Sequence, residues 1–223
     1  MYLSLLILLP VLTATAVLFA KEAGRVRAIA LLGSTLQLFL CGWLLFAYQH
    51  ERAAGNAAQM LFEHNHMWYA PFSITYHVGV DGISVAMILL TALVVLAGIL
   101  VSWNVEKMTK EFFFLLLFLS AGAYGFFISL DLFTMFFFLE LAVIPKFLLI
   151  AIWGSGKKEY SANKLALMLM GGSALVFVGL LGLYFYSGIN SFDLMQLSQL
   201  PIPTEVQHKF FPLLFLGFGV FGA

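Results

Sequence analysis

The sequence contains few charged residues. Charged side chains make up 10% of its 223 residues, where a soluble domain usually has about 25%. Such a chain cannot cover a water-facing surface, so a soluble globular enzyme is excluded, and a hydrophobic content of 62% excludes a disordered chain. The 11 basic residues are balanced by 11 acidic ones, which argues against a nucleic-acid partner bound through a basic patch.

Cysteine is almost absent as well. The one cysteine, Cys41, can form neither an internal disulfide nor an iron–sulfur site by itself. His64 and His66 show no obvious third ligand for a metal. We therefore expect no redox centre, bound cofactor or metal in this chain.

Long apolar runs fill the sequence, whose mean hydropathy is +1.00. Because about 20 apolar residues in a helix cross a bilayer core, the runs predict an all-α, polytopic transmembrane helical bundle that forms a single domain over residues 1–223. Six runs are long enough to cross, at residues 2–20, 28–48, 82–103, 112–130, 132–153 and 162–186. A seventh run, from Phe210 to Ala223, has 14 residues and is too short, so we expect a fragment or a truncated reading frame.

Two of these spans are separated by one acidic residue. The run from Phe112 to Trp153 has 42 residues, and a single helix of that length would be about twice as long as the bilayer is thick. We expect it to fold back as two spans. Asp131 is the only acid near its middle, so the turn is predicted there.

The charges of the connecting loops predict the orientation. Seven basic residues fall in the odd-numbered loops: Lys21, Arg25, Arg27, Lys107, Lys110, Lys157 and Lys158. The opposite side carries Arg52 and Lys209. By the positive-inside rule the odd loops lie inside. The N-terminus and the longest loop, residues 49–81, are then outside, in the periplasm if the membrane is a bacterial inner membrane.

One acid falls near the middle of a predicted span. Glu140 lies about nine residues into the fifth run, and a charge at bilayer depth costs several kcal/mol. Such acids usually mark ion pathways, so we favour a carboxyl that loads and releases protons. The alternative is a permanent buried ion pair that fixes helix packing.

Two lysines and a proline accompany this glutamate. Lys146 lies six residues further on, which places it about 120° away around a helix, and Pro145 can kink the helix and free carbonyl groups between them. Lys164 falls in the first turns of the sixth run. Either lysine could extend to the inner interface, and for Lys164 a role in proton transfer is equally open.

Two aspartates stand at the starts of spans. Asp131 and Asp81 each precede an apolar run. Either could be a relay acid, but we favour helix caps, because aspartate accepts hydrogen bonds from the free N–H groups of a first turn. The small residues GGSA at 171–174 predict a close approach between helices.

Four segments resemble a known family. They are SLDLFTMFFFLELAVIPKFLLIAIWG at 129–154, HVGVDGISV at 77–85, SWN at 102–104 and KEYSANKLALMLMGGSA at 158–174. They look like the antiporter-like, proton-pumping subunits of bacterial NADH:quinone oxidoreductase (respiratory complex I), of the M type, which share their family with multisubunit cation/proton antiporters. The glutamate-to-proline spacing of Glu140 and Pro145 is the most specific feature.

The resemblance implies the N-terminal part of an inverted-repeat fold, with neighbouring antiporter-like membrane-arm subunits and the lipid bilayer as partners. NADH, FMN, iron–sulfur clusters and quinone would then belong to partner subunits. Glu140 matches the family's mid-membrane glutamate, and Lys164 matches a lysine at the start of the sixth span. Lys146 departs from a position that is usually apolar. If GFGVFGA aligns with the family's seventh helix, Phe221 stands where relatives have a lysine.

The resemblance leaves three functions open. The chain is expected to take part in proton translocation coupled to quinone reduction. It could instead belong to a sodium/proton antiporter, which would use the same glutamate. The third alternative is a truncated remnant that transports nothing, in keeping with the absent lysine.

Overall fold

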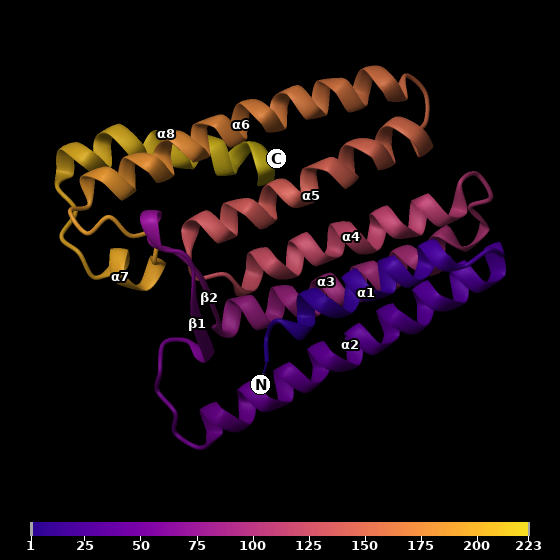
Figure 1. Cartoon of the computed structure of the whole chain (residues 1–223), viewed down its shortest axis with the longest axis horizontal. Helices are drawn as coiled ribbons and strands as arrows, with labels where there is room; N and C mark the ends of the chain where they lie inside the picture. Colours follow the sequence, from indigo (N-terminus) through magenta and orange to yellow (C-terminus); the bar gives the residue numbers. More distant parts are fainter. Residues whose placement is uncertain (1, 223) are drawn as a thin grey trace. The chain divides into compact units, whose positions relative to one another are not determined.

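The computed structural model describes residues 2–222, which form helices and one small sheet (Figure 1). The elements, in chain order, are α1 (Leu5–Phe19), α2 (Ala23–Ala53), β1 (Leu61–Tyr69), η1 (Ala70–Phe72), β2 (Ile74–Val80), α3 (Gly82–Val101), η2 (Ser102–Asn104), α4 (Thr109–Ile128), α5 (Leu132–Trp153), α6 (Lys158–Tyr186), α7 (Leu194–Ser198) and α8 (Thr204–Gly222).

The chain divides into two compact units. The first unit comprises Met1–Glu63 and Gly79–Ile128, and the second comprises His64–Val78 and Ser129–Ala223. Each unit therefore combines stretches that are far apart in the sequence. The expectation of one transmembrane domain stays a prediction, because compact packing units are not separate domains.

Helices α1 to α4 form the first unit around a small apolar core. The core residues include Ala14 and Val17 of α1, Ala30 of α2, Ile99 of α3 and Phe113 of α4. All five have an exposed fraction of zero, so their side chains hold the four helices together by close packing.

A glycine sets the approach of α1 to α2. A Cβ atom added at Gly33 would overlap the side chain of Thr13. The two helices can come this close because Gly33 has no side chain, which is the usual way in which membrane helices pack tightly.

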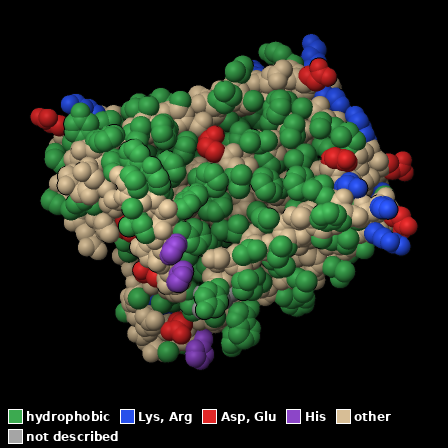
Figure 2. All heavy atoms as spheres, in the orientation of Figure 1, with side chains coloured by type: hydrophobic (Ala, Val, Ile, Leu, Met, Phe, Trp, Pro, Cys, Tyr) green, Lys and Arg blue, Asp and Glu red, His purple; other side chains and the backbone are tan. Residues whose placement is uncertain are grey.

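Within residues 2–222, five helices are long and apolar enough to cross a membrane, judged by length and composition: α2, α3 (extended by η2), α4, α5 and α6. At most 44% of any of their most apolar stretches is buried within the chain. Figure 2 accordingly shows hydrophobic side chains over much of the visible surface. Apolar surface on this scale is typical of helices that face lipid or other membrane subunits.

The predicted spans agree with these helices except at the two ends of the sequence. The run at 2–20 forms a helix of 15 residues, α1, about 22 Å long. The last run begins earlier than predicted: α8 starts at Thr204 and includes Pro212. Residues 204–209 extend this helix; they are polar and exposed except for Val206, which is buried.

The turn predicted at Asp131 is confirmed. Helix α4 ends at Ile128 and α5 begins at Leu132, so the apolar run of 112–153 forms two helices. The backbone of the short connection pairs with two other segments: Ser129 forms an antiparallel bridge with Val78, and Asp131 forms one with Asp193.

The predicted outer loop, residues 49–81, contains more structure than expected. Its first residues complete α2, and β1 and β2 then pair as a two-stranded sheet. Strand β2, with the sequence ITYHVGV, is rich in the β-branched and aromatic residues that favour strands. The all-α description therefore holds for the bundle and is incomplete for this hairpin.

Helices α5 to α8 build the core of the second unit, in which α6 and α8 lie side by side (Figure 1). Glycines of α6 make this close approach possible. A Cβ at Gly172 would lie 2.8 Å from Val220, and one at Gly179 would lie 2.7 Å from Leu214. The close approach predicted from GGSA is therefore confirmed at Gly172. Gly171 has nothing within 4 Å of its would-be Cβ.

Candidate functional site

Glu140 is the ninth residue of α5, about 12 Å along the axis from its start. Its Oε1 atom is buried and has no hydrogen-bond partner within residues 2–222. The hydroxyl of Ser173, on α6, lies beside the same carboxyl. An unpaired carboxylate in apolar surroundings is costly, so its charge must be matched by a proton, a cation or water.

Glu140 lines a groove of about 770 Å³ between α5 and α6. The groove is lined by Phe137, Glu140, Leu141, Val143, Ile144 and Phe147 of α5 and by Asn163, Ala166, Leu167 and Met170 of α6. Glu140 is the only ionisable residue of this lining. A single carboxyl in an apolar groove is suited to holding one small cationic species, because no second charge competes for it.

Pro145 adds a second polar group on α5. It lies inside the helix and is buried. Since proline has no N–H, the carbonyl of Leu141, four residues earlier, lacks its usual helical hydrogen bond. Leu141 and Glu140 both line the groove, so the residue with the freed carbonyl and the residue with the carboxyl border the same space. The predicted kink stays a prediction.

The structure does not bring the two lysines to Glu140. Lys146 is half-buried on α5, and Lys164 is exposed in the second turn of α6. Neither residue lines the groove, and neither forms an ion pair with Glu140 among the residues described. Phe221 of α8, which the resemblance would align with the family's lysine, packs against the apolar core of the second unit.

Asp131 is a helix cap with further partners. Its carboxylate accepts a hydrogen bond from the N–H of Thr134 (2.9 Å), as the N-cap of α5, and two more from the N–H and hydroxyl of Thr75 on β2 (3.0 and 3.1 Å). Its exposed fraction is zero. Asp81 caps α3 with a single bond from the Ser84 N–H (2.7 Å).

A buried histidine and aspartate, which sequence reasoning missed, lie close to this cap. His77 Nδ1 of β2 is 2.8 Å from Oδ2 of Asp193, and the exposed fractions of the two residues are 6% and 4%. Asp193 also caps α7 through the Gln196 N–H and pairs with Asp131 in an antiparallel bridge. Asp131 and Asp193 stand in two similar tetrapeptides, SLDL and SFDL. This repetition was the one signal in the sequence that could have suggested the bridge between the two aspartates.

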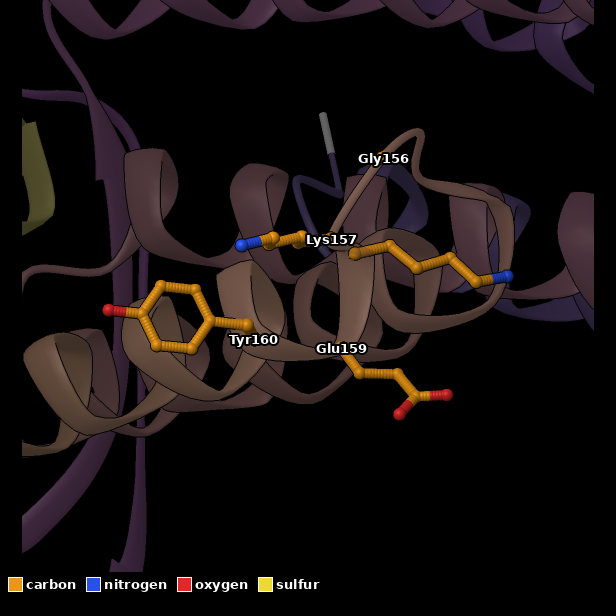
Figure 3. A pocket seen from close by; sticks show the side chains of 5 residues that line it. Gly156, Lys157, Glu159 and Tyr160 are labelled. Atoms are coloured by element: carbon orange, nitrogen blue, oxygen red, sulfur yellow. The ribbon is translucent and has the colours of Figure 1, made fainter.

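The turn between α5 and α6 forms a second hollow, which does not form a site. It is lined by the consecutive residues Gly156–Tyr160. Figure 3 shows that the side chains of Glu159 and Tyr160 point in different directions and do not converge. Lys158 extends back to the carbonyl of Ile152, 2.7 Å away, and so caps the end of α5. In addition, no group of three or more histidine, cysteine or acidic side chains suited to a metal occurs within residues 2–222.

An isolated carboxyl inside a bundle of membrane-spanning helices is typical of ion-translocating membrane proteins. Comparison with known proteins gives the family. Residues 129–223 match the family described as NADH:quinone oxidoreductase/Mrp antiporter, TM. The chain belongs to this family of antiporter-like membrane subunits.

The similar curated proteins are of one type. NADH-quinone oxidoreductase subunit M of Pseudomonas aeruginosa is 33% identical over 235 residues, which cover 99% of this chain and 45% of that protein. NAD(P)H-quinone oxidoreductase chain 4-2 of Synechocystis is 31% identical over 200 residues, 90% of this chain and 35% of that protein. The chain thus resembles the M (chain 4) members and spans less than half of their length.

Two solved structures share the fold. A chain of respiratory complex I from Thermus thermophilus matches with a TM-score of 0.81 and 26% identity, over 98% of this chain and 42% of that chain. A chain of the membrane-bound sulfane sulfur reductase, an archaeal respiratory membrane complex, matches with a TM-score of 0.79 and 22% identity, over 96% and 43%. At that identity, the second match shows the fold alone.

Proposed function

We propose that this chain takes part in proton translocation as part of an M-type membrane subunit of an NADH:quinone oxidoreductase. The observation that carries the proposal is the buried, unpartnered Oε1 of Glu140 in the apolar groove between α5 and α6. The names of the relatives supply the complex, and the groove supplies the group that binds the proton.

Glu140 is the proton carrier in this proposal. Moving one charge through 100 mV takes about 2.3 kcal/mol, which corresponds to an approximately fiftyfold change in proton affinity. A carboxyl whose surroundings alternate between the apolar groove and a hydrated or cationic state can change its affinity by that factor. The adjacent Ser173 hydroxyl and the Leu141 carbonyl provide polar atoms for water on this route.

Lys164 and Lys146 are assigned roles at the edges of this route. Lys164 is exposed near the start of α6, on the side of the basic residues Lys157 and Lys158, so we place it at the inner entrance. Lys146 is half-buried and lies six residues, about one and two-thirds turns, beyond Glu140. It is placed as a movable counter-charge that compensates for the lack of a lysine at Phe221.

The redox reaction is assigned to other subunits. NADH, FMN, iron–sulfur clusters and quinone would be bound by partners. For the clusters the reason is chemical: they need several cysteine ligands, and this chain has one. Neighbouring antiporter-like subunits would pack against the apolar helix surfaces. The proposed location is a bacterial inner membrane with the N-terminus outside, as the loop charges predict.

The test is a Glu140→Gln substitution in the natural gene, with the complex kept in its native membrane. We expect NADH-driven proton uptake into inverted vesicles to be abolished, while the assembled complex is still recovered. Glu159→Gln is the matched control, because Glu159 is an exposed acid in the first turn of α6, and it should pump normally. An unchanged proton-to-electron ratio in Glu140→Gln would sink the proposal and favour the remnant.

The same measurement addresses a sodium/proton antiporter, the second function that the family description covers. If the chain belongs to an antiporter, a sodium-dependent proton flux should remain when NADH oxidation is prevented. Glu140→Gln should abolish that flux. A redox-driven subunit predicts that no flux remains without NADH oxidation. The two outcomes separate the functions on one set of vesicles.

A further inference from the structure

A polar cluster lies inside the first unit, whereas the Glu140 groove belongs to the second unit. Gln37 of α2 and Tyr124 of α4 are almost fully buried, with exposed fractions of 4% and 0%. The side chains of Gln37 and Cys41 lie close enough to the Tyr124 hydroxyl to interact with it, but neither forms a hydrogen bond of acceptable geometry to it. Buried polar groups are costly unless each has a hydrogen-bond partner, so their partners need to be identified.

The amide nitrogen of Gln37 has a clear partner. Pro10 of α1 has no N–H and leaves the carbonyl of Leu6 without its helical hydrogen bond. Gln37 Nε2 donates to this carbonyl at 3.0 Å. A side chain of α2 thus replaces the bond that a proline removes from α1, and it holds the Gln37 amide in one orientation.

That orientation leaves two polar atoms without partners. Neither Gln37 Oε1 nor the Tyr124 hydroxyl has a hydrogen bond to any part of residues 2–222. Both residues line one small enclosed cavity, together with Pro10, Gly33, Ser34, Ala92, Val95, Leu117 and Ser120. The cavity measures about 10 Å³, which is the lower bound that a single water needs on this kind of measure.

The hydrogen-bonding groups around the cavity match those of one water molecule. The hydroxyls of Ser34 and Ser120 already donate, to the carbonyls of Leu31 (3.0 Å) and Leu117 (2.6 Å), so each keeps only an oxygen that can accept. Tyr124 can donate its O–H, and Gln37 Oε1 can only accept. A water that accepts from Tyr124 and donates to Gln37 and to one serine would make three bonds, the usual number for a buried water.

We propose that one ordered water molecule is an integral part of the α1–α4 core and joins Tyr124, Gln37 and a serine hydroxyl. The site binds water and no larger ligand, because the cavity has no further volume. The water completes a chain of polar contacts from the Leu6 carbonyl of α1, through Gln37 of α2, to Tyr124 of α4.

A Tyr124→Phe variant of the whole protein tests the proposal by the sign of its effect. If water is bound, the variant removes one of its hydrogen bonds, and we expect the melting temperature in detergent to fall by about 2–4 °C. If no water is bound, the hydroxyl is a buried donor without a partner, and its removal should raise the melting temperature. Tyr160→Phe is the control and should not change it, because Tyr160 is 66% exposed.

A direct measurement decides the matter even if the variant fails to fold. A density map of the unmodified protein at about 2 Å should show a solvent peak within hydrogen-bond distance of Tyr124 Oη and Gln37 Oε1. A cavity without a peak overturns the proposal, and so does a direct bond between these two atoms. The peak's second acceptor, Ser34 or Ser120, identifies the serine.

Discussion

At the scale of single residues, Asp131 connects three segments. Its carboxylate binds the first turn of α5 and two groups of Thr75, and its backbone pairs with Asp193. Asp81 makes the same kind of cap at α3 with one bond only. The two aspartates therefore form a natural pair for separating the value of a cap from that of the added contacts.

We predict that Asp131→Ala destabilises the protein more than Asp81→Ala. Loss of a cap costs about 0.5–2 kcal/mol in either variant. Asp131→Ala also removes the acceptor of the N–H and hydroxyl of Thr75, which is half-buried. A fully buried donor without a partner costs about 1–3 kcal/mol, so we expect an added loss below the upper end of that range. Thermal unfolding of both variants in the same detergent measures the difference. Equal losses would show that the contacts to Thr75 contribute nothing beyond the cap.

Local patterns predicted single residues well where the cause was local. Asp131 and Asp81 could be placed at helix starts because each directly precedes an apolar run. Glu140 stood out as an acid within a span. The His77–Asp193 pair could not be found this way, because 116 residues separate its members and each looks like an ordinary loop residue.

At the scale of elements, the α6–α8 contact depends on glycine at certain positions only. Gly172 faces Val220, whereas the adjacent Gly171 faces open space. Both lie inside the same helix, so any substitution changes helix propensity by the same amount at both. The difference between them reports packing alone.

We expect Gly172→Leu to separate α6 from α8 and Gly171→Leu to leave them in contact. Overpacking at a close helix contact costs about 1–3 kcal/mol or more, while an outward-facing change stays within about 0.5 kcal/mol. Crosslinking between cysteines placed on α6 and α8, together with thermal unfolding, measures both effects. A stable, crosslinked Gly172→Leu protein would contradict the packing described here.

Apolar length predicted the long helices, and it failed at the hairpin. The strands β1 and β2 contain polar residues such as Glu63, His64 and His66, so the segment resembled a solvated loop. Strand pairing depends on contacts between segments, which a window of hydropathy does not detect. For the same reason, the short helix α7 was not anticipated.

At the scale of the whole molecule, the proposed orientation depends on loop charge. We predict that a cysteine at Ala57, in the outer loop, reacts with a membrane-impermeant maleimide in intact cells. A cysteine replacing Glu159, in the first turn of α6, should react only after permeabilisation. Both positions are exposed, and a Cys41→Ala background removes the native thiol, which is buried. Reversed labelling would place the basic loops outside.

The family of the molecule could be predicted from the sequence more fully than its site could. The segments around Glu140 carried the family, which the comparisons confirm. The relation of Lys146 and Lys164 to Glu140 could not be read from spacing, and neither lies in the groove. A lysine's long side chain and a helix's rotation decide such contacts, and a one-dimensional pattern contains neither.

The pairing of His77 with Asp193 has a consequence for the order of events during synthesis and folding of the protein. His77 leaves the ribosome 116 residues before Asp193, an interval of about 6–23 s at ordinary rates of synthesis. Four helices, α3 to α6, are made in that time. Strand β2 is therefore synthesised well before the segment with which it pairs, and the second unit can complete its packing only after the segment before α7 has been made.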